Sequence, residues 1–152
     1  MKLFLDIDGV LVHANPMKKV EFDDDGFYKF NSEAVSVLNK LSIDNVEIIL
    51  SSSHRHRFTL SKWKTIFKKR GVHFDKFSII KSDITYKDSR RIEIENWIRL
   101  KRYKPSEVLI IDDDKSLNGL EIDFKNRLIL TNPYFGLKDD FEIKRVLSRK
   151  AV

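Results

Sequence analysis

The chain has 152 residues, no cysteine and a formal net charge of +6. This length fits one domain, and the absence of cysteine excludes a disulfide framework, a thiolate zinc site and a cysteine nucleophile. No apolar stretch approaches the ~18 residues of a membrane span, and the start of the chain turns acidic too soon for a secretory signal, so we expect a single cytoplasmic domain over residues 1–152.

Short apolar runs alternate with amphipathic stretches along the chain, which is the order expected of βαβ units and a mainly parallel sheet. The apolar runs predict five strands, at residues 2–7, 46–50, 77–80, 108–111 and 127–131. Apolar residues at helical spacing predict helices at 31–41, at 58–70, from the capping-box sequence at 85–88 to Tyr103, and at 139–149. The chain is therefore expected to belong to the α/β class.

Some conspicuous side chains are expected to be structural. Trp63 and Trp97 lie at helical spacing with other apolar residues. Exposed aromatic rings serve as stacking platforms for bases, but this spacing favours packing in the core. The acidic run Asp23-Asp24-Asp25-Gly26 is typical of a solvated turn, and we assign it no role.

The basic residues gather in short runs, and two interpretations of them stay open. The runs are at residues 54–57, 62–64, 68–70, 90–91 and 99–104. Lysine and arginine are favoured on the solvated faces of helices, which is the plain interpretation. The alternative is a basic rim around an acidic pocket, which would attract a polyanion that carries a phosphate.

Two acidic clusters directly follow apolar runs. Leu3-Phe4-Leu5 precedes Asp6-Ile7-Asp8-Gly9, and Val108-Leu109-Ile110-Ile111 precedes Asp112-Asp113-Asp114. Open α/β sheets bind their ligands at the carboxyl ends of the strands. Two groups of anions brought together there would repel each other strongly unless a hard cation lay between them. The sequence therefore predicts a Mg²⁺ site.

The sequence Asp6-Ile7-Asp8-Gly9-Val10 resembles the motif that opens the haloacid dehalogenase-like (HAD) phosphohydrolases, and later motifs of that superfamily follow in order over essentially the whole chain. The resemblance implies that Asp6 is the nucleophile that becomes an aspartyl phosphate. It implies that Asp8 is the general acid and then the general base. Residues two apart on a chain that leaves a strand can both address one phosphate, which suits these roles.

The same resemblance implies the ligands of the Mg²⁺ ion and the fold. Asp6, the backbone carbonyl of Asp8, and Asp112 would bind the ion directly, and Asp113 would bind it directly or through water. The expected fold is a three-layer α/β/α Rossmann-like sheet with the strand order fifth, fourth, first, second, third. This order places the first and fourth strands side by side, which brings Asp6 to Asp112.

A hydroxyl at the end of the second strand is the next motif of the superfamily, and here that strand runs into Ser51-Ser52-Ser53. Such a hydroxyl and the neighbouring amides can hydrogen-bond the phosphoryl oxygens. Counting from the strand end favours Ser51, whereas alignment with the Thr-Ser-Trp-Arg arrangement common in the superfamily favours Ser52. His54 and His56 lack the spacing of a zinc site, and we expect them at the surface beside the phosphate.

A basic side chain near the start of the helix before the last acidic strand is the third motif. It is needed because the carboxylates surround a dianionic substrate with negative charge. The spacing to the following apolar and aromatic positions selects Arg90. Lysine is the commoner residue at this place in the superfamily, so Lys87 stays the alternative.

Many members of the superfamily carry an inserted cap domain that closes over small substrates. About 40 residues separate Asp8 from Ser51, and a helix takes up part of them, so no cap is expected. The tail Arg127 to Pro133, Gly136-Leu137 and the Ser-His-Arg stretch resemble the HAD group of Swiss Army Knife RNA-repair proteins, although His54 stands where a tryptophan is usual. That resemblance implies a substrate at a nucleic-acid end.

We therefore expect a Mg²⁺-dependent phosphatase that acts through an aspartyl phosphate, with a nucleic-acid 3′- or 5′-phosphate as the favoured substrate. A phosphoprotein or a small metabolite is the alternative substrate, and a HAD-fold module that binds nucleic acid or protein without turnover is the alternative function. Transfer of the phosphoryl group to an acceptor other than water also stays open. The sequence leaves open the oligomeric state and the conformation of residues 12–30, for which a flap over the site is one option.

Overall fold

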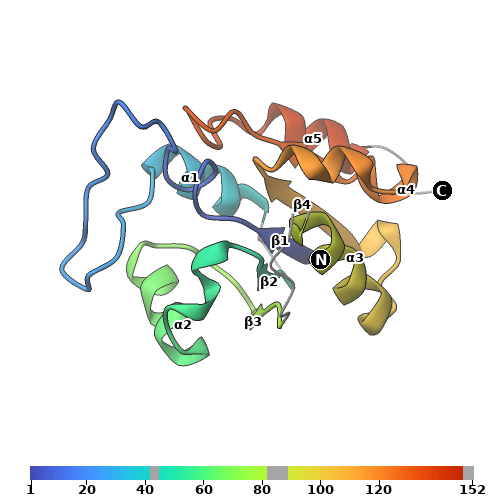
Figure 1. Cartoon of the computed structure of the whole chain (residues 1–152), viewed down its shortest axis with the longest axis horizontal. Helices are drawn as coiled ribbons and strands as arrows, with labels where there is room; N and C mark the ends of the chain where they lie inside the picture. The colour runs from blue at the N-terminus through green and yellow to red at the C-terminus, as the bar shows by residue number, and fades with distance from the viewer. Residues whose placement is uncertain (42–44, 82–88, 149–152) are drawn as a thin grey trace.

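The computed structural model describes residues 1–41, 45–81 and 89–148. Its strands form one sheet in the order β3-β2-β1-β4-β5, and every neighbouring pair is parallel (Figure 1). The strands are β1 (Lys2–Leu5), β2 (Glu47–Leu50), β3 (Lys76–Ile79), β4 (Val108–Asp112) and β5 (Leu128–Leu130). The predicted strand order is thus confirmed, with the first strand in the centre between the second and the fourth.

Helices cover both faces of this sheet, as predicted for a three-layer fold. The described helices are α1 (Ser32–Leu41), α2 (Leu60–Lys69), α3 (Ser89–Lys101), α4 (Ile122–Lys125) and α5 (Phe141–Ser148), with short 3-10 helices η1 (Ser53–His56), η2 (Pro105–Glu107) and η3 (Lys115–Gly119). Between Asp8 and Ser51, the described residues hold an irregular segment, α1 and β2 but no cap domain.

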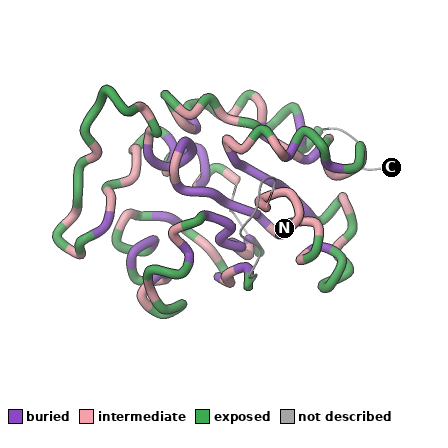
Figure 2. Tube along the Cα trace, in the orientation of Figure 1, coloured by how far each residue is buried: buried purple, intermediate pink, exposed green. Residues whose placement is uncertain are grey.

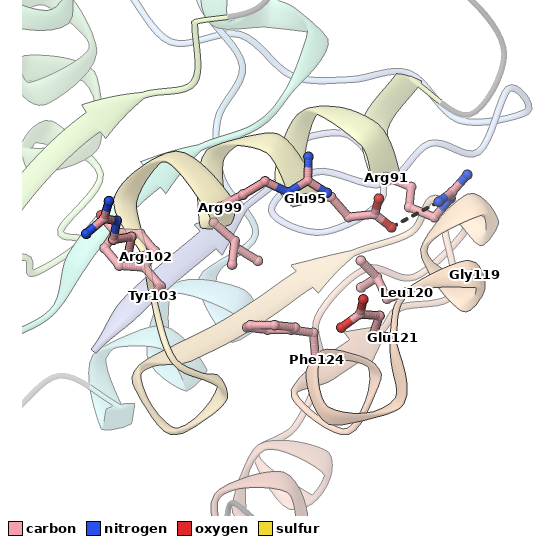
Figure 3. A pocket seen from close by; sticks show the side chains of 10 residues that line it. Arg91, Glu95, Arg99, Arg102, Tyr103, Gly119, Leu120, Glu121 and Phe124 are labelled. Atoms are coloured by element: carbon pink, nitrogen blue, oxygen red, sulfur yellow. Dashed lines mark hydrogen bonds and ion pairs between the residues drawn. The ribbon is translucent and has the colours of Figure 1, made fainter.

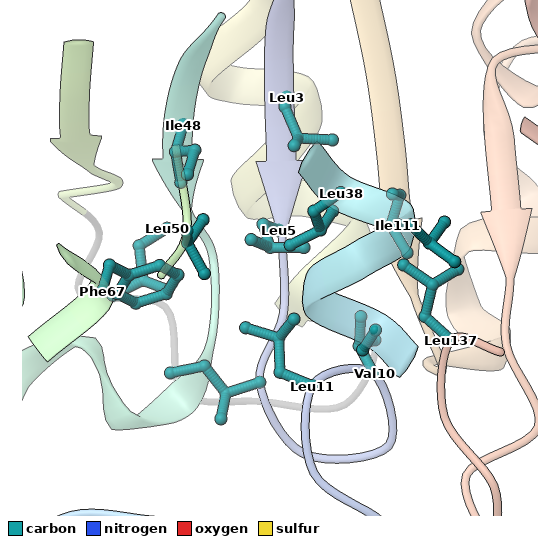
Figure 4. Packing of buried hydrophobic residues seen from close by; sticks show 14 of the residues in the cluster. Leu3, Leu5, Val10, Leu11, Leu38, Ile48, Leu50, Phe67, Ile111 and Leu137 are labelled. Carbon is teal, nitrogen blue, oxygen red and sulfur yellow. The ribbon is translucent and has the colours of Figure 1, made fainter. Parts of the chain in front are cut away.

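Side chains of the central strand point alternately into two apolar clusters, because successive residues of a strand face opposite sides of a sheet. Leu3 and Leu5 pack with residues of α1, α2 and α5 (Figure 4). Phe4 packs on the other face with residues of α3 and η3. Figure 2 shows that the central strands are buried and that much of the surface of the helices is exposed. Trp63 is fully buried in the first cluster, and Trp97 packs against the second, which confirms their structural role.

Several element boundaries differ from the predicted ones for identifiable local reasons. Strand β1 ends at Leu5 rather than at residue 7. Helix α2 begins at residue 60 because the Thr59 side chain caps it by accepting a hydrogen bond from the Lys62 amide. Helix α3 ends at residue 101, so Tyr103 lies outside it, because Arg102 adopts a left-handed conformation with φ 56°. The capping-box sequence at 85–88 lies outside the described residues.

The acidic run 23–25 forms a turn in which Asp24 is exposed, as predicted, but Asp25 is largely buried and has a structural role. The guanidinium of Arg70, which follows α2, donates to both carboxylate oxygens of Asp25 at 2.6 and 2.8 Å. It also donates to the backbone oxygens of Phe27 and Tyr28. These contacts hold the long loop after β1, which projects beside α2 in Figure 1, against the end of that helix. Phe27 is fully buried, so this part of the loop is packed.

Candidate active site

Three carboxyl groups converge at the carboxyl edge of the sheet. Ligand atoms of Asp6, Asp112 and Asp113 all lie within 4.8 Å of one another. Strand register brings them together, since Leu5 pairs with Ile111 and the Asp6 amide donates to the Ile111 carbonyl at 3.2 Å. Asp6 is 4% exposed and Asp112 is fully buried.

The turn after β1 fits tightly against this acid cluster, and Gly9 makes the fit possible. Gly9 has φ 77°, and a Cβ atom there would overlap the carboxylate of Asp113. Thr131, which follows β5, fixes the turn from the other side, because its hydroxyl donates to the Gly9 carbonyl at 2.6 Å. A larger side chain at position 9 would both strain the backbone and displace a member of the acid cluster.

Arg90 is the cation that the structure places in the acid cluster. Its Nη1 lies 2.5 Å from Asp112 Oδ2 and 3.3 Å from Asp6 Oδ2. It comes from the first turn of α3, as the sequence predicted. Although burial opposes the charged form, Asp6 and Asp112 raise the pKa of Arg90 above its ordinary value. The alternative residue, Lys87, lies outside the described residues.

The acid cluster carries more negative charge than Arg90 neutralises. Burial, followed by the charge of Asp6, raises the pKa of the Asp112 carboxyl well above its ordinary value. The same causes, together with a hydrogen bond to Asp6, raise the pKa of Asp113 to about 7. Three oxygen-bearing groups whose mutual repulsion shifts their pKa values upward are suited to a hard divalent cation, which relieves that repulsion.

Ser51 and Ser52 are both buried at the end of β2, but their side chains differ. The Ser52 hydroxyl caps η1 by accepting a hydrogen bond from the His54 amide at 3.2 Å. The Ser51 hydroxyl has no hydrogen-bond partner among the described residues. The Ser51 amide donates to the Leu5 carbonyl at 3.1 Å, which continues the sheet and sets Ser51 beside Asp6.

Asp8 lies at the rim and is paired with His54, a contact that the sequence did not predict. The His54 Nε2 and the Asp8 Oδ2 are 2.7 Å apart, and the Asp8 side chain is 44% exposed. Phe27 and Tyr28 contact the imidazole edge-on, with ring centroids 5.6 and 5.5 Å away. The expectation that His54 lies at the surface is therefore wrong, because the loop after β1 packs over it. His56 is exposed.

Arg55 is also buried, so only part of the basic run 54–57 faces solvent. Its guanidinium forms an ion pair with Glu93 of α3 and donates to the carbonyls of Ser52 and Ile80. Glu93 lies three residues after Arg90, on the same helix. This buried pair thus ties the serine loop to the helix that supplies the cation of the acid cluster.

A separate cleft of about 520 Å³ lies between α3 and the η3–α4 segment (Figure 3). Leu120 and Phe124 line one wall, and Arg91, which pairs with Glu95 at 2.9 Å, lines the other. None of the three clustered aspartates lines it. We therefore assign it no part in the chemistry of the acid cluster.

A parallel α/β sheet with buried carboxylates and a basic residue at its carboxyl edge is the architecture of a HAD-type phosphatase. Residues 2–141 match the family model described as the HAD domain in Swiss Army Knife RNA repair proteins. The chain belongs to this family and is a phosphatase of the HAD superfamily.

Comparisons with solved structures and with curated sequences add little to the family match. The cobalt-bound form of the deoxy-D-mannose-octulosonate 8-phosphate phosphatase from Haemophilus influenzae is similar with a TM-score of 0.44 and 12% identity, over 95% of this chain and 84% of that one. A comparison with curated protein sequences finds no match. Among the described residues, no helix is long and apolar enough to cross a membrane.

Proposed function

We propose that the protein is a Mg²⁺-dependent phosphomonoesterase in which Asp6 is the nucleophile. The observation that carries this proposal is the position of Asp6, which is buried beside Arg90 and within 4.8 Å of two further carboxyl groups. A buried carboxylate that is held by a cation at the carboxyl edge of a parallel sheet is suited to attack an electrophile bound there. The family match supports the same chemistry.

In the first half of the reaction, an Asp6 oxygen attacks phosphorus and the bond from phosphorus to the leaving oxygen breaks. Asp8, at the rim, gives its proton to that oxygen. In the second half, Asp8 takes a proton from water, the water oxygen attacks phosphorus, and the aspartyl phosphate breaks to free Asp6 and inorganic phosphate. Arg90 and the Ser51 hydroxyl stabilise the phosphoryl oxygens as charge builds on them.

A bound Mg²⁺ would supply charge neutralisation, which lets a phosphate dianion approach the carboxylates. Asp6, Asp112 and Asp113 are the side chains that would hold it, and the Asp8 carbonyl is a further candidate ligand. Carboxylate and carbonyl oxygens, completed by waters, are the ligands that Mg²⁺ prefers.

The favoured substrate is a phosphate at the end of a nucleic-acid strand. The family to which the chain belongs is named after RNA repair proteins. Within residues 1–41, 45–81 and 89–148, no cap domain covers the site. An open site admits the end of a polymer. A phosphoprotein or a small metabolite is the rival substrate.

Hydrolysis of p-nitrophenyl phosphate tests the chemistry. We expect turnover that requires Mg²⁺, stops with EDTA and is lost in Asp6→Asn. Asp123→Asn, at an exposed aspartate on α4, is the matched control and should behave like the wild type. Equal low turnover in the wild type and Asp6→Asn would contradict the proposal.

A substrate panel then tests the preference for nucleic acid. Oligonucleotides with a 3′- or a 5′-phosphate are compared with phosphopeptides and sugar phosphates at equal concentration. We expect the highest kcat/KM on one class of oligonucleotide. Rates on oligonucleotides no better than on sugars would remove the preference, while tight binding of an oligonucleotide by the wild type without any hydrolysis would indicate a binding module.

A further inference from the structure

The turn from Asn132 to Leu137, after β5, is rigidly built and displays two adjacent aromatic side chains. The Asn132 carbonyl accepts hydrogen bonds from the amides of Phe135 and Gly136 at 3.1 and 2.8 Å. The Asn132 side chain accepts a third from the Tyr134 amide at 3.0 Å. We call residues 132–137 the aromatic turn.

The aromatic turn is fixed to the segment that carries the candidate nucleophile. The Leu137 amide donates to the Val10 carbonyl at 2.9 Å, and the Ala14 amide donates to the Pro133 carbonyl at 2.7 Å. Gly136, with φ 72°, lies so close that a Cβ atom there would be 2.6 Å from the Val10 oxygen. Figure 4 shows Leu137 beside Val10 in the core.

Thr131 joins the aromatic turn directly to the acid cluster. Its amide donates to the Asp112 carbonyl at 2.9 Å and its hydroxyl to the Gly9 carbonyl. Tyr134 follows three residues later, and three residues span at most about 11 Å. The aromatic turn is therefore within the reach of a nucleotide whose phosphate lies at Asp6.

The two aromatic rings of this turn lie outside the hydrophobic core. Tyr134 is 52% exposed and Phe135 is 48% exposed, although Leu137, two residues further, is buried. The ammonium of Lys138 lies 4.2 Å from the centroid of the Phe135 ring. Exposed rings combined with a lysine are the elements with which proteins bind single-stranded nucleic acid, because bases stack on the rings and the cation attracts the backbone.

We propose that the aromatic turn is a stacking platform for the unpaired bases of a nucleic-acid strand whose terminal phosphate lies at Asp6. This inference rests on the proposed function and adds its means of substrate selection. A nucleic-acid strand suits the turn better than a peptide does, because flat exposed rings beside the Lys138 ammonium match bases and phosphates. The chain's net charge of +6 also favours a polyanion.

The test compares three substrates that present the same terminal phosphate. They are a single-stranded oligonucleotide, the same strand with abasic sites in its last three positions, and p-nitrophenyl phosphate. The variants are Tyr134→Ala and Phe135→Ala together, with Phe141→Ala, an exposed aromatic of α5, as the matched control. We expect the double variant to lose about 10-fold in kcat/KM on the natural strand, chiefly through KM, and nothing on p-nitrophenyl phosphate.

The abasic strand separates stacking from charge. We expect the wild type to hydrolyse the abasic strand as slowly as the double variant does, and the double variant to handle both strands equally. Equal kcat/KM for the wild type and the double variant on the natural strand would overturn this inference while leaving the proposed function intact. Hydrolysis of p-nitrophenyl phosphate without hydrolysis of any strand would instead remove the proposed nucleic-acid substrate. If the variant damages the fold and loses as much on p-nitrophenyl phosphate, the wild type alone decides, and equal kcat/KM on the natural and the abasic strand would overturn the inference.

Discussion

The imidazole Nε2 of His54 and the carboxylate Oδ2 of Asp8 share a hydrogen bond of 2.7 Å, which joins the loop after β2 to the loop after β1. Asp8 follows β1 by three residues and is half exposed, so little else restrains its rotamer. His54 is held by its own packing against Phe27 and Tyr28. The pair therefore fixes the direction of the group that we propose as general acid.

Removal of this contact should slow the hydrolysis of phosphates with poor leaving groups. His54→Ala is expected to lower kcat about 10-fold on an alkyl phosphate such as a nucleotide, because protonation of that leaving oxygen needs an aligned acid. The effect on p-nitrophenyl phosphate should be much smaller, since its phenolate leaves readily without a proton. His54→Gln, which keeps an N–H donor, should retain most activity. Equal losses of His54→Ala on both substrates would contradict this positioning role.

The raised pKa of Asp113 predicts how stability depends on pH in the metal-free protein. The folded state holds a proton on Asp113 up to about pH 7, whereas the unfolded chain releases it near 3.8. The contribution of this group to stability is therefore lost as pH rises between these values. Asp113→Asn should become more stable than the wild type across this window, as measured by urea unfolding in EDTA. A stability difference that does not change with pH would contradict the assignment.

Mg²⁺ should make the wild type more stable than Asp113→Asn, which is the reverse of the order expected without metal. At pH 8 the wild type is expected to unfold at higher urea concentration when Mg²⁺ is added, because the ion binds the folded state. Asp113→Asn should gain less, and Asp123→Asn should gain as much as the wild type. No gain in the wild type at millimolar Mg²⁺ would count against the metal site.

The ion pair between Arg55 and Glu93 should be among the most sensitive contacts in the molecule. Arg55→Met is expected to cost about 3–5 kcal/mol of unfolding free energy, because it removes one member of a buried ion pair. The double variant with Glu93→Leu should recover much of that loss. Arg91→Met, which removes a half-exposed partner of Glu95 on the same helix, is the control and should cost less than about 1 kcal/mol. A small cost for Arg55→Met would contradict a buried, charged pair.

The pair of Asp25 and Arg70 should stabilise the protein above pH 4 and fail in acid. The hydrogen bonds from Arg70 lower the pKa of Asp25 to about 2, against 3.8 in the unfolded chain. Stability from this group is present above the unfolded value and is lost as pH falls toward 2. Asp25→Asn should cost roughly 1–2 kcal/mol at neutral pH and progressively less as pH falls through about 2. Asp24→Asn, at a side chain that is 85% exposed, should cost little at either pH.

Much of the fold could be predicted from the sequence because the strands are nearly continuous apolar runs, and buried parallel strands have that pattern. The strand order followed from the resemblance of the acidic motifs. The acid cluster was predictable for the same reason, since Asp6 and Asp112 directly follow two such runs. Element ends were less predictable, because they depend on single caps such as Thr59 and on the left-handed Arg102.

The contacts around the site could not be predicted, because they join segments far apart in the sequence. The sequence pattern indicates that His54 and Arg55 belong to a basic surface run. In the structure, His54 pairs with Asp8 and Arg55 pairs with Glu93. That Ser52 rather than Ser51 caps η1 could not be predicted either, because it depends on local backbone conformation. Asp25 of the acidic turn likewise pairs with Arg70, which lies 45 residues later in the chain.

Trapping of the covalent intermediate tests the role of Asp6 most directly. The Asp8→Asn variant is mixed with Mg²⁺ and p-nitrophenyl phosphate, quenched in acid and mapped by mass spectrometry. The phenolate leaves without an acid, but breakdown of the aspartyl phosphate lacks its base, so one phosphoryl group should accumulate on Asp6 and be absent when Asp6→Asn is added. Release of p-nitrophenolate by Asp8→Asn with no phosphoryl group on Asp6 at any time would contradict Asp6 as the nucleophile.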